Sequence, residues 1–108
     1  MFKKKSDNLD LQHISEIDKV VHEPARMMII AYLYVVESGD FVFLMRQTGL
    51  TKGNLSSHLS KLDKAGYVEI KKEFVEKIPR TLISLSSVGR KAFEEYQEKM
   101  KDILGKFG

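Results

Sequence analysis

The sequence predicts a single, mainly α-helical domain that carries a small β-hairpin. Apolar residues recur at steps of three and four over most of the chain, which is typical of helices that bury one face. After residue 66 the spacing changes to alternation, which indicates strands, and the helical spacing returns near the C-terminus. No repeat, low-complexity tract or linker divides the chain, so residues 1–108 are expected to share one core.

Two helices are expected in the N-terminal third of the chain. The first is marked by three apolar residues on one face: Ile14, Ile17 and Val21. Pro24 suits the first position of the second helix, which continues through the nearly all-apolar segment 25–36 and ends at Gly39. We therefore expect this second helix at the centre of the core. Residues 1–12 are expected to be flexible.

A pair of helices joined by a tight turn is expected in the middle of the chain. A bridging strand over 40–42 leads into a short helix over 43–48. Thr51 is a good N-cap for the next helix, 52–65, and Gly66 is a good C-terminal stop. Three leucines give this helix a stripe for the core: Leu55, Leu59 and Leu62. The short break between the two helices has the length of a helix-turn-helix.

A β-hairpin and a final helix complete the chain. Three apolar residues share one face of the first strand: Val68, Ile70 and Phe74. The turn is expected over 76–79, within a tip that spans 75–80, and either Ser86 or Ser87 can cap the last helix, 87–107. This helix repeats apolar residues with a period of about 3.5, a spacing that favours a second helix as partner: Phe93, Tyr96, Met100, Ile103 and Phe107.

The elements therefore follow the order helix, helix, short strand, helix, turn, helix, hairpin, helix. This is the order of a winged helix-turn-helix, in which the hairpin after the second helix of the pair forms the wing. The net charge of +3 is concentrated in this part of the chain: residues 51–80 hold seven Lys or Arg against four Asp or Glu. A polyanionic partner is consistent with this charge distribution, although a solvated lysine-rich surface would explain it equally well.

The composition excludes several functional classes. The absence of cysteine removes disulfides, thiolate zinc sites, iron–sulfur clusters and cysteine nucleophiles, and it favours the cytoplasm. The longest apolar stretch, 27–36, is far shorter than the roughly 20 residues that span a bilayer. Since there is no phosphate loop, framed carboxylate pair or serine elbow, we expect no enzyme activity. A metal site of His22 with Asp18 and His13 would straddle a loose junction before Pro24, so neither metal nor cofactor is expected.

The helix over 52–65 turns a polar surface away from its leucines. At 100° per residue this surface consists of Gly53, Asn54, Ser57, Ser60, Lys61 and Lys64. It contains no carboxylate, because Asp63 falls near the buried side or its margin. Amide, hydroxyl and ammonium groups hydrogen-bond to phosphates and base edges, so this surface suits a DNA major groove. His58 lies beside it, where it could either contact a phosphate or pack against the flank of the helix.

Five segments resemble the small winged helix-turn-helix transcriptional regulators of bacteria and archaea, in particular the MarR and ArsR groups. They are VHEPAR (21–26), GLTKGNLSSHL (49–59), LDKAGYV (62–68), IPRT (78–81) and LSSVGR (85–90). The resemblance extends over residues 14–104. ArsR-type metal sensors use cysteines, or histidines on the last helix, and this chain has neither.

The resemblance implies a homodimer on double-stranded DNA with a pseudo-palindromic operator. One set of residues is then expected to contact DNA: Lys52, Gly53, Asn54, Ser56, Ser57 and Lys61 on the helix, and Lys77 and Arg80 on the wing. A second set is expected at the dimer interface: Ile14, Ile17, Phe93, Tyr96, Met100, Ile103 and Phe107. The alternative is a winged helix that binds another protein, because the fold alone does not determine function.

Overall fold

The computed structural model describes residues 11–107 and places five helices and three strands within them. The helices are α2 (Gln12–Ser15), α3 (Pro24–Val36), α4 (Phe41–Thr48), α5 (Lys52–Lys64) and α6 (Ser87–Gly105). The strands are β1 (Ser38–Asp40), β2 (Val68–Val75) and β3 (Ile78–Leu85), which form an antiparallel sheet in the order β1-β3-β2. This architecture confirms the predicted winged helix-turn-helix. Over the described range, no helix has the length and apolar character needed to cross a membrane.

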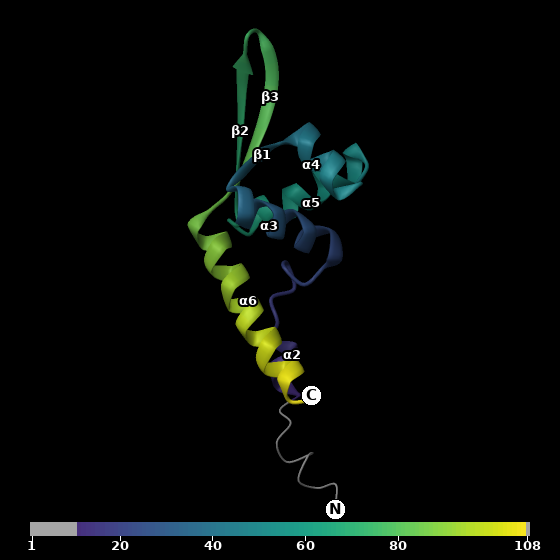
Figure 1. The fold of residues 1–108 in the computed structure, drawn as a ribbon, viewed down its shortest axis with the longest axis vertical. Helices are drawn as coiled ribbons and strands as arrows, with labels where there is room; N and C mark the ends of the chain where they lie inside the picture. Colours follow the sequence, from purple (N-terminus) through teal and green to yellow (C-terminus); the bar gives the residue numbers. More distant parts are fainter. Residues whose placement is uncertain (1–10, 108) are drawn as a thin grey trace, which may run out of the picture.

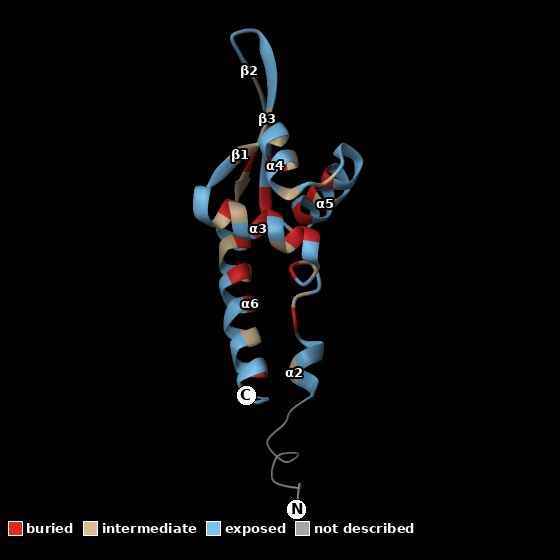
Figure 2. Ribbon diagram, turned by 45° about the vertical axis from the view of Figure 1, so that its right-hand side comes forward, coloured by how far each residue is buried: buried red, intermediate tan, exposed pale blue. Residues whose placement is uncertain are grey.

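The molecule is elongated, with the β2–β3 hairpin at one end and α2 beside the C-terminal part of α6 at the other (Figure 1). Between these ends lies a helical head built from α3, α4 and α5. Most of the fully buried side chains lie in this head and at the base of the sheet (Figure 2). They include Val21, Ile29, Ile30, Leu33, Leu44, Leu55, Leu62 and Ile83. The predicted central position of α3 and the predicted leucine stripe of α5 are both confirmed.

The N-terminal segment differs from the prediction of a helix through Ile14, Ile17 and Val21. The helix α2 covers only four residues, and the chain between it and α3 consists of turns. The Asp18 carboxylate explains the difference, because its Oδ1 accepts hydrogen bonds from the backbone N–H groups of Val20 (2.9 Å) and Val21 (3.2 Å). Such local bonds compete with a helix for backbone donors. The expected flexible segment 1–12 falls almost wholly outside the described residues, and its last residue begins α2.

The strand before α4 is also shifted, from the predicted 40–42 to Ser38–Asp40, where it pairs with residues 82–84 of β3. Asp40 sets this boundary because its side chain accepts a hydrogen bond from Phe43 N at 2.7 Å. Asp40 is therefore the N-cap of α4, and the helix begins at Phe41, two residues earlier than expected.

The tip of the wing is tighter than the predicted turn over 76–79. Glu76 and Lys77 alone connect the strands, and both have positive φ, 52° and 67°. Two successive residues of this kind define a type I′ turn, whose twist matches that of a hairpin. Pro79 consequently lies within β3, paired with Phe74 of β2. It is tolerated there because β1 pairs only with residues 82–84, so this stretch of β3 has a free edge.

The start of α6 is fastened to the junction between α5 and β2. Of the two candidate caps, Ser86 is the N-cap: its Oγ accepts a hydrogen bond from Gly89 N and donates one to Gly66 O. A Cβ atom at Gly89 would overlap the Tyr67 carbonyl, so this close approach requires glycine. These contacts fix the position of the start of α6 relative to the base of the wing.

Candidate nucleic-acid interface

Helix α5 is held to the head along its buried face and at both ends. Thr51 caps its N-terminus by accepting a hydrogen bond from Asn54 N (3.2 Å). At its other end Gly66 has a φ of +79°, and Tyr67 N donates to Leu62 O (2.9 Å). This bond satisfies one of the last carbonyls of the helix. The position of α5 is therefore determined by the core and by its caps.

The outward surface of α5 has the composition that the sequence predicts. All six residues of that surface are exposed: Gly53, Asn54, Ser57, Ser60, Lys61 and Lys64. The first turn of the helix contains no acidic residue, so the positive end of its macrodipole is not neutralised from within. Lys52 lies at this end and is also exposed. The helix thus offers hydrogen-bond donors and positive charge to an approaching anion.

One flank of α5 contacts the start of α3 through His58. The Nδ1 atom of His58 lies 3.1 Å from Arg26 Nη1 and 4.0 Å from Glu23 Oε1. Because a guanidinium can only donate, His58 Nδ1 accepts this bond. Arg26 is 8% exposed and also donates to the carbonyl of Val20. Of the two possibilities for His58, the structure therefore places it against the flank.

Glu23 completes this cluster at the N-terminus of α3. Its side chain accepts a hydrogen bond from Arg26 N (2.8 Å), which lowers the pKa of the Glu23 carboxyl below its ordinary value. Burial opposes this shift, and the charge of Arg26 adds to it. This flank of α5 is thereby connected to the capped N-terminus of α3.

The opposite flank of α5 faces the wing across a hollow of about 500 Å³. Ser56, which the resemblance assigns to DNA, is exposed and lines this hollow together with Lys52 and Ser60. Asp63 also lines it and is exposed, so of the two predicted positions, near the buried side or at its margin, only the margin fits. Lys72 and Thr81 contribute the wing side of the hollow.

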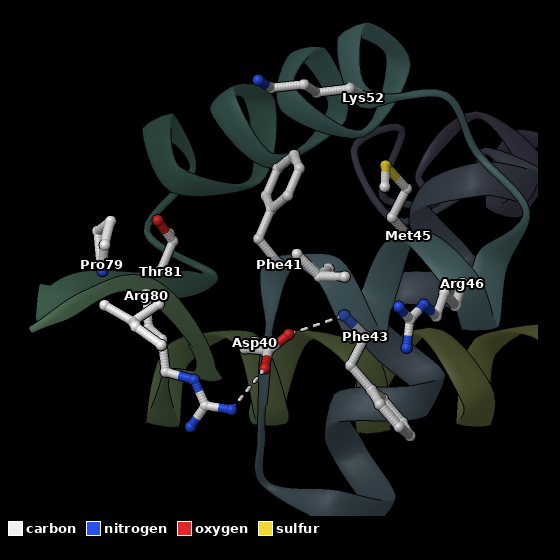
Figure 3. A pocket seen from close by; sticks show the side chains of 11 residues that line it. Asp40, Phe41, Phe43, Met45, Arg46, Lys52, Pro79, Arg80 and Thr81 are labelled. Atoms are coloured by element: carbon white, nitrogen blue, oxygen red, sulfur yellow. Dashed lines mark hydrogen bonds and ion pairs between the residues drawn. The ribbon is translucent and has the colours of Figure 1, made fainter. Parts of the chain in front are cut away.

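A second hollow, of about 750 Å³, lies between α4, the start of α5 and the wing (Figure 3). Pro79 and Thr81 project from β3 toward the side of Lys52, whereas Arg80 projects to the other side, toward Asp40. The Arg80 Nη2 atom lies 3.5 Å from Asp40 Oδ2. Arg80 is therefore already paired within the chain, while Lys77 at the tip is exposed.

Lys72, Thr81 and Phe41 were missed as site residues by the sequence reasoning. All three line the hollow between α5 and the wing. Alternation along β3 gives the signal that could have found Thr81, because it shares a face with the buried Ile83. Phe41 could not be placed in this way, since its position depends on the shifted start of α4.

The residues assigned to a dimer interface separate into two groups. Ile17, Phe93, Tyr96 and Ile103 are buried within the single chain. Phe93 packs edge-on against Tyr34, with ring centroids 5.3 Å apart. Ile14 and Phe107, in contrast, are 44% and 57% exposed, and Met100 is half-buried. The first group therefore has a role inside the protomer, and only the second retains surface for a partner.

Two of the three residues considered for a metal site, His22 and Asp18, make hydrogen bonds within the chain. His22 Nδ1 lies 2.7 Å from the Tyr96 hydroxyl, and Asp18 accepts hydrogen bonds from the Tyr67 hydroxyl and from two backbone N–H groups. Among residues 11–107 no group of three or more His, Cys, Asp or Glu is arranged to hold a metal ion.

Comparisons with known proteins agree with this geometry. An uncharacterised protein of Methanocaldococcus jannaschii is 38% identical over 78 residues, which cover 72% of this chain and 85% of that protein. The structure of a transcriptional regulator homologue from Pyrococcus horikoshii superposes with a TM-score of 0.81 at 25% identity, covering 87% of this chain and 95% of that one.

A MarR-family regulator from Silicibacter pomeroyi shares the fold, with a TM-score of 0.61 at 17% identity over 98% of this chain and 68% of its own. Residues 25–104 match the family described as the winged helix DNA-binding domain. Since this match spans well over half of the sequence, the chain belongs to the winged helix DNA-binding domain family.

Proposed function

We propose that the protein is a transcriptional regulator that binds specific double-stranded DNA as a homodimer. In this proposal α5 enters the major groove and the wing contacts the flanking DNA. The observation that carries the proposal is the outward surface of α5, which is exposed, free of carboxylates and anchored from behind by three buried leucines. The Pyrococcus horikoshii relative, named as a transcriptional regulator homologue, supports it.

The individual side chains of this surface suit base and phosphate contacts. Asn54 can pair with adenine through two hydrogen bonds, and Lys61 can reach guanine or a phosphate. Ser57 can bond to either. Gly53 has no side chain to hold the backbone away from a base pair, and a Cβ there would meet no protein atom within 4 Å. Lys52 and the N-terminus of α5 suit a phosphate.

The far end of the molecule supports the homodimer. At the end where α2 lies beside the C-terminal part of α6, four large apolar residues are exposed: Leu11, Ile14, Leu104 and Phe107. A groove of about 780 Å³ also runs along α6, lined in part by Met27, Tyr34 and Met100. An exposed apolar surface of this kind is typical of an interface with a partner chain. A two-fold dimer requires half-sites about 34 Å apart, hence a pseudo-palindromic operator.

Salt-dependent binding tests the DNA part of the proposal. The affinity for a fluorescein-labelled duplex, followed by anisotropy, should fall linearly on a log–log scale as salt rises, because phosphate contacts release counterions. Lys61→Glu should weaken binding by about 10- to 100-fold. Lys91→Glu on the exposed side of α6 changes the net charge equally and should have little effect. Equal losses for the two variants would exclude α5 as the specific contact.

Sedimentation tests the dimer. Lys substitutions at Leu104 and Phe107 should produce monomers without unfolding, because both side chains are exposed. Ile103 is avoided, since a lysine there would disrupt the core of the protomer. The matched control places lysines at Val42 and Val88, which are also exposed but lie away from this surface. A dimer that survives the substitutions at Leu104 and Phe107 would place the interface elsewhere. Binding to another protein but to no duplex would favour the alternative of a winged helix that binds another protein.

A further inference from the structure

The tip of the wing carries large apolar side chains on both of its faces, and they stay exposed in the described part of the chain. Phe74 is 76% exposed, Ile78 is 63% exposed and Val75 is 39% exposed. The strand register places Phe74 opposite Pro79 and Val75 opposite Ile78. Because successive strand residues point to opposite faces, Phe74 and Pro79 lie on one face of the tip, and Val75 and Ile78 lie on the other. Single exposed apolar residues are common, but a phenylalanine that is 76% exposed at a projecting tip, beside a proline, indicates a surface that is covered in use.

The two faces of the hairpin differ in charge. Successive strand residues point to opposite faces, so Phe74 shares its face with Lys72 and with the paired residues Pro79 and Thr81. No acidic residue lies on this face of either strand. Both acidic residues of β2, Glu69 and Glu73, lie on the opposite face, where Glu73 pairs with Lys71 at 3.8 Å.

The Phe74 face is also the face that is turned toward α5. Lys72 and Thr81 line the hollow against that helix, and Pro79 and Thr81 line the hollow that reaches Lys52. Phe74 lies beyond these residues along the hairpin, toward the tip. An anion bound along the outward surface of α5 would therefore next meet Lys72, across a hollow that Asp63 also lines, and then the Phe74 ring.

We infer that Phe74 is an apolar wedge that enters the minor groove of the DNA flanking the α5 site. This inference rests on the proposed function and specifies how the wing binds. Apolar side chains such as Phe and Pro insert between base steps from the minor groove, unstack them and bend the duplex. Lys72 on the same face and Lys77 in the turn are placed to neutralise the phosphates on either side. Pro79, paired with Phe74, supports the ring with a rigid partner.

Tryptophan fluorescence tests the inference directly, because the chain contains no tryptophan. Phe74→Trp places a single reporter at the tip, and Val35→Trp places the control on α3, where Val35 is 79% exposed and lines neither hollow. On addition of a mixed-sequence duplex, the Phe74→Trp protein should show quenched emission and protection from acrylamide. The Val35→Trp protein should show neither change, although anisotropy of the labelled duplex confirms that it binds.

Affinity and base unstacking provide the second measurement. Phe74→Ala should weaken binding by about 5- to 100-fold, the range expected for a lost aromatic stack on a base. It should also abolish the rise in 2-aminopurine fluorescence that wild-type protein causes in the flanking sequence, whereas Phe74→Leu should retain part of it. Val35→Ala should match the wild type in both assays.

The outcomes separate the inference from the function on which it rests. If the wild-type protein binds the duplex but the Phe74→Trp signal and the Phe74→Ala affinity are unchanged, the wedge is wrong and the proposed function stands. If the wild-type protein binds no duplex at any salt concentration, both are wrong. A Phe74→Trp signal that changes with protein concentration in the absence of DNA would assign the tip to contact between copies of the chain and overturn the inference.

Discussion

The two parts of the candidate interface, α5 and the wing, are attached to the protein in opposite ways. Helix α5 buries Leu55, Leu59 and Leu62 in the head and is bonded to α3 through His58. The wing is buried only at its base, at Val68 and Ile83, and its outer residues from 71 to 80 have no core beneath them. Beyond the base, the Arg80–Asp40 ion pair joins it to the start of α4. The core thus determines the position of α5, whereas the tip of the wing is positioned by its own turn.

This difference suits two kinds of DNA contact. Hydrogen bonds to base edges require donors and acceptors at fixed positions, which a helix packed against a core provides. Contacts to flanking phosphates and to a deformable minor groove tolerate an adjustable element. An anchored helix beside a projecting hairpin would therefore combine sequence readout with a contact that adapts to DNA shape.

The difference in anchoring between α5 and the wing is tested most directly by one alanine substitution in each of them. Leu62→Ala in α5 should destabilise the protein by about 2 to 5 kcal/mol, because it leaves a cavity in the core. Ile78→Ala in the wing should change stability by less than about 0.5 kcal/mol, because its side chain is already 63% exposed. Urea unfolding of both variants gives the two values, and similar losses would mean that the wing is also part of the core.

The leucine stripe illustrates what the sequence could predict. Thr51, the three leucines and Gly66 act within a single helix, so their spacing alone was sufficient to define α5. The segment after Ile14 has the same apolar spacing but does not form a long helix, because the Asp18 side chain takes the backbone donors at 20 and 21. The spacing of apolar residues predicts a helix but carries no information about a side chain that competes for the backbone N–H groups.

The wing illustrates what the sequence could not predict. Phe74 follows the same alternation as Val68, yet Val68 is 2% exposed and Phe74 is 76% exposed. The difference arises because β2 extends past the head, and this length becomes apparent only in three dimensions. Ser56 and Arg80 were assigned from the resemblance, but Ser56 faces the wing and Arg80 pairs with Asp40. Their contribution to DNA binding stays a prediction.

The junction between the two regions should show a distinctive pH dependence through Tyr67. Burial, and next the hydrogen bond to Asp18 with its charge, raise the pKa of the Tyr67 hydroxyl to about 12, from an ordinary value of 10.0. Stability that depends on the protonated hydroxyl is therefore fully present below pH 10 and is lost as the pH rises toward 12. The loss should be about 2 kcal/mol.

Tyr67→Phe isolates this effect. Burial also raises the pKa of Tyr96, and Glu94 raises that of Tyr34, but both residues remain in the variant. The difference in unfolding free energy between wild type and variant should consequently shrink between pH 10 and pH 12. The two proteins can be compared by urea unfolding at fixed pH values. A difference that does not change with pH would show that Tyr67 titrates normally in the folded protein.

A smaller effect is expected from the N-cap of α5. Thr51→Ala removes the acceptor for Asn54 N and should destabilise the protein by about 1 kcal/mol. Thr51→Ser retains the hydroxyl and should cost only a fraction of that value. Thermal unfolding of the two variants measures both effects. If serine were as harmful as alanine, the methyl group of Thr51, and not its hydrogen bond, would hold the start of α5.

The smallest effect should come from the turn of the wing, and its sign should be the reverse. Glu76 occupies the first position of a type I′ turn with a φ of 52°, a conformation that favours asparagine over glutamate. Glu76→Asn should therefore stabilise the hairpin by about 0.5 kcal/mol. Glu76→Gln removes the same charge but keeps the unfavourable side chain, so it is the matched control.

Hydrogen exchange gives the resolution that this last test needs. Because the tip is anchored only through its own strands, Glu76→Asn should slow exchange of the amides of residues 71–80 while leaving those of α5 unchanged. The control should change neither set. If the α5 amides were also protected, the turn would be coupled to the head, and the wing would be a rigid part of the interface instead of an adjustable one.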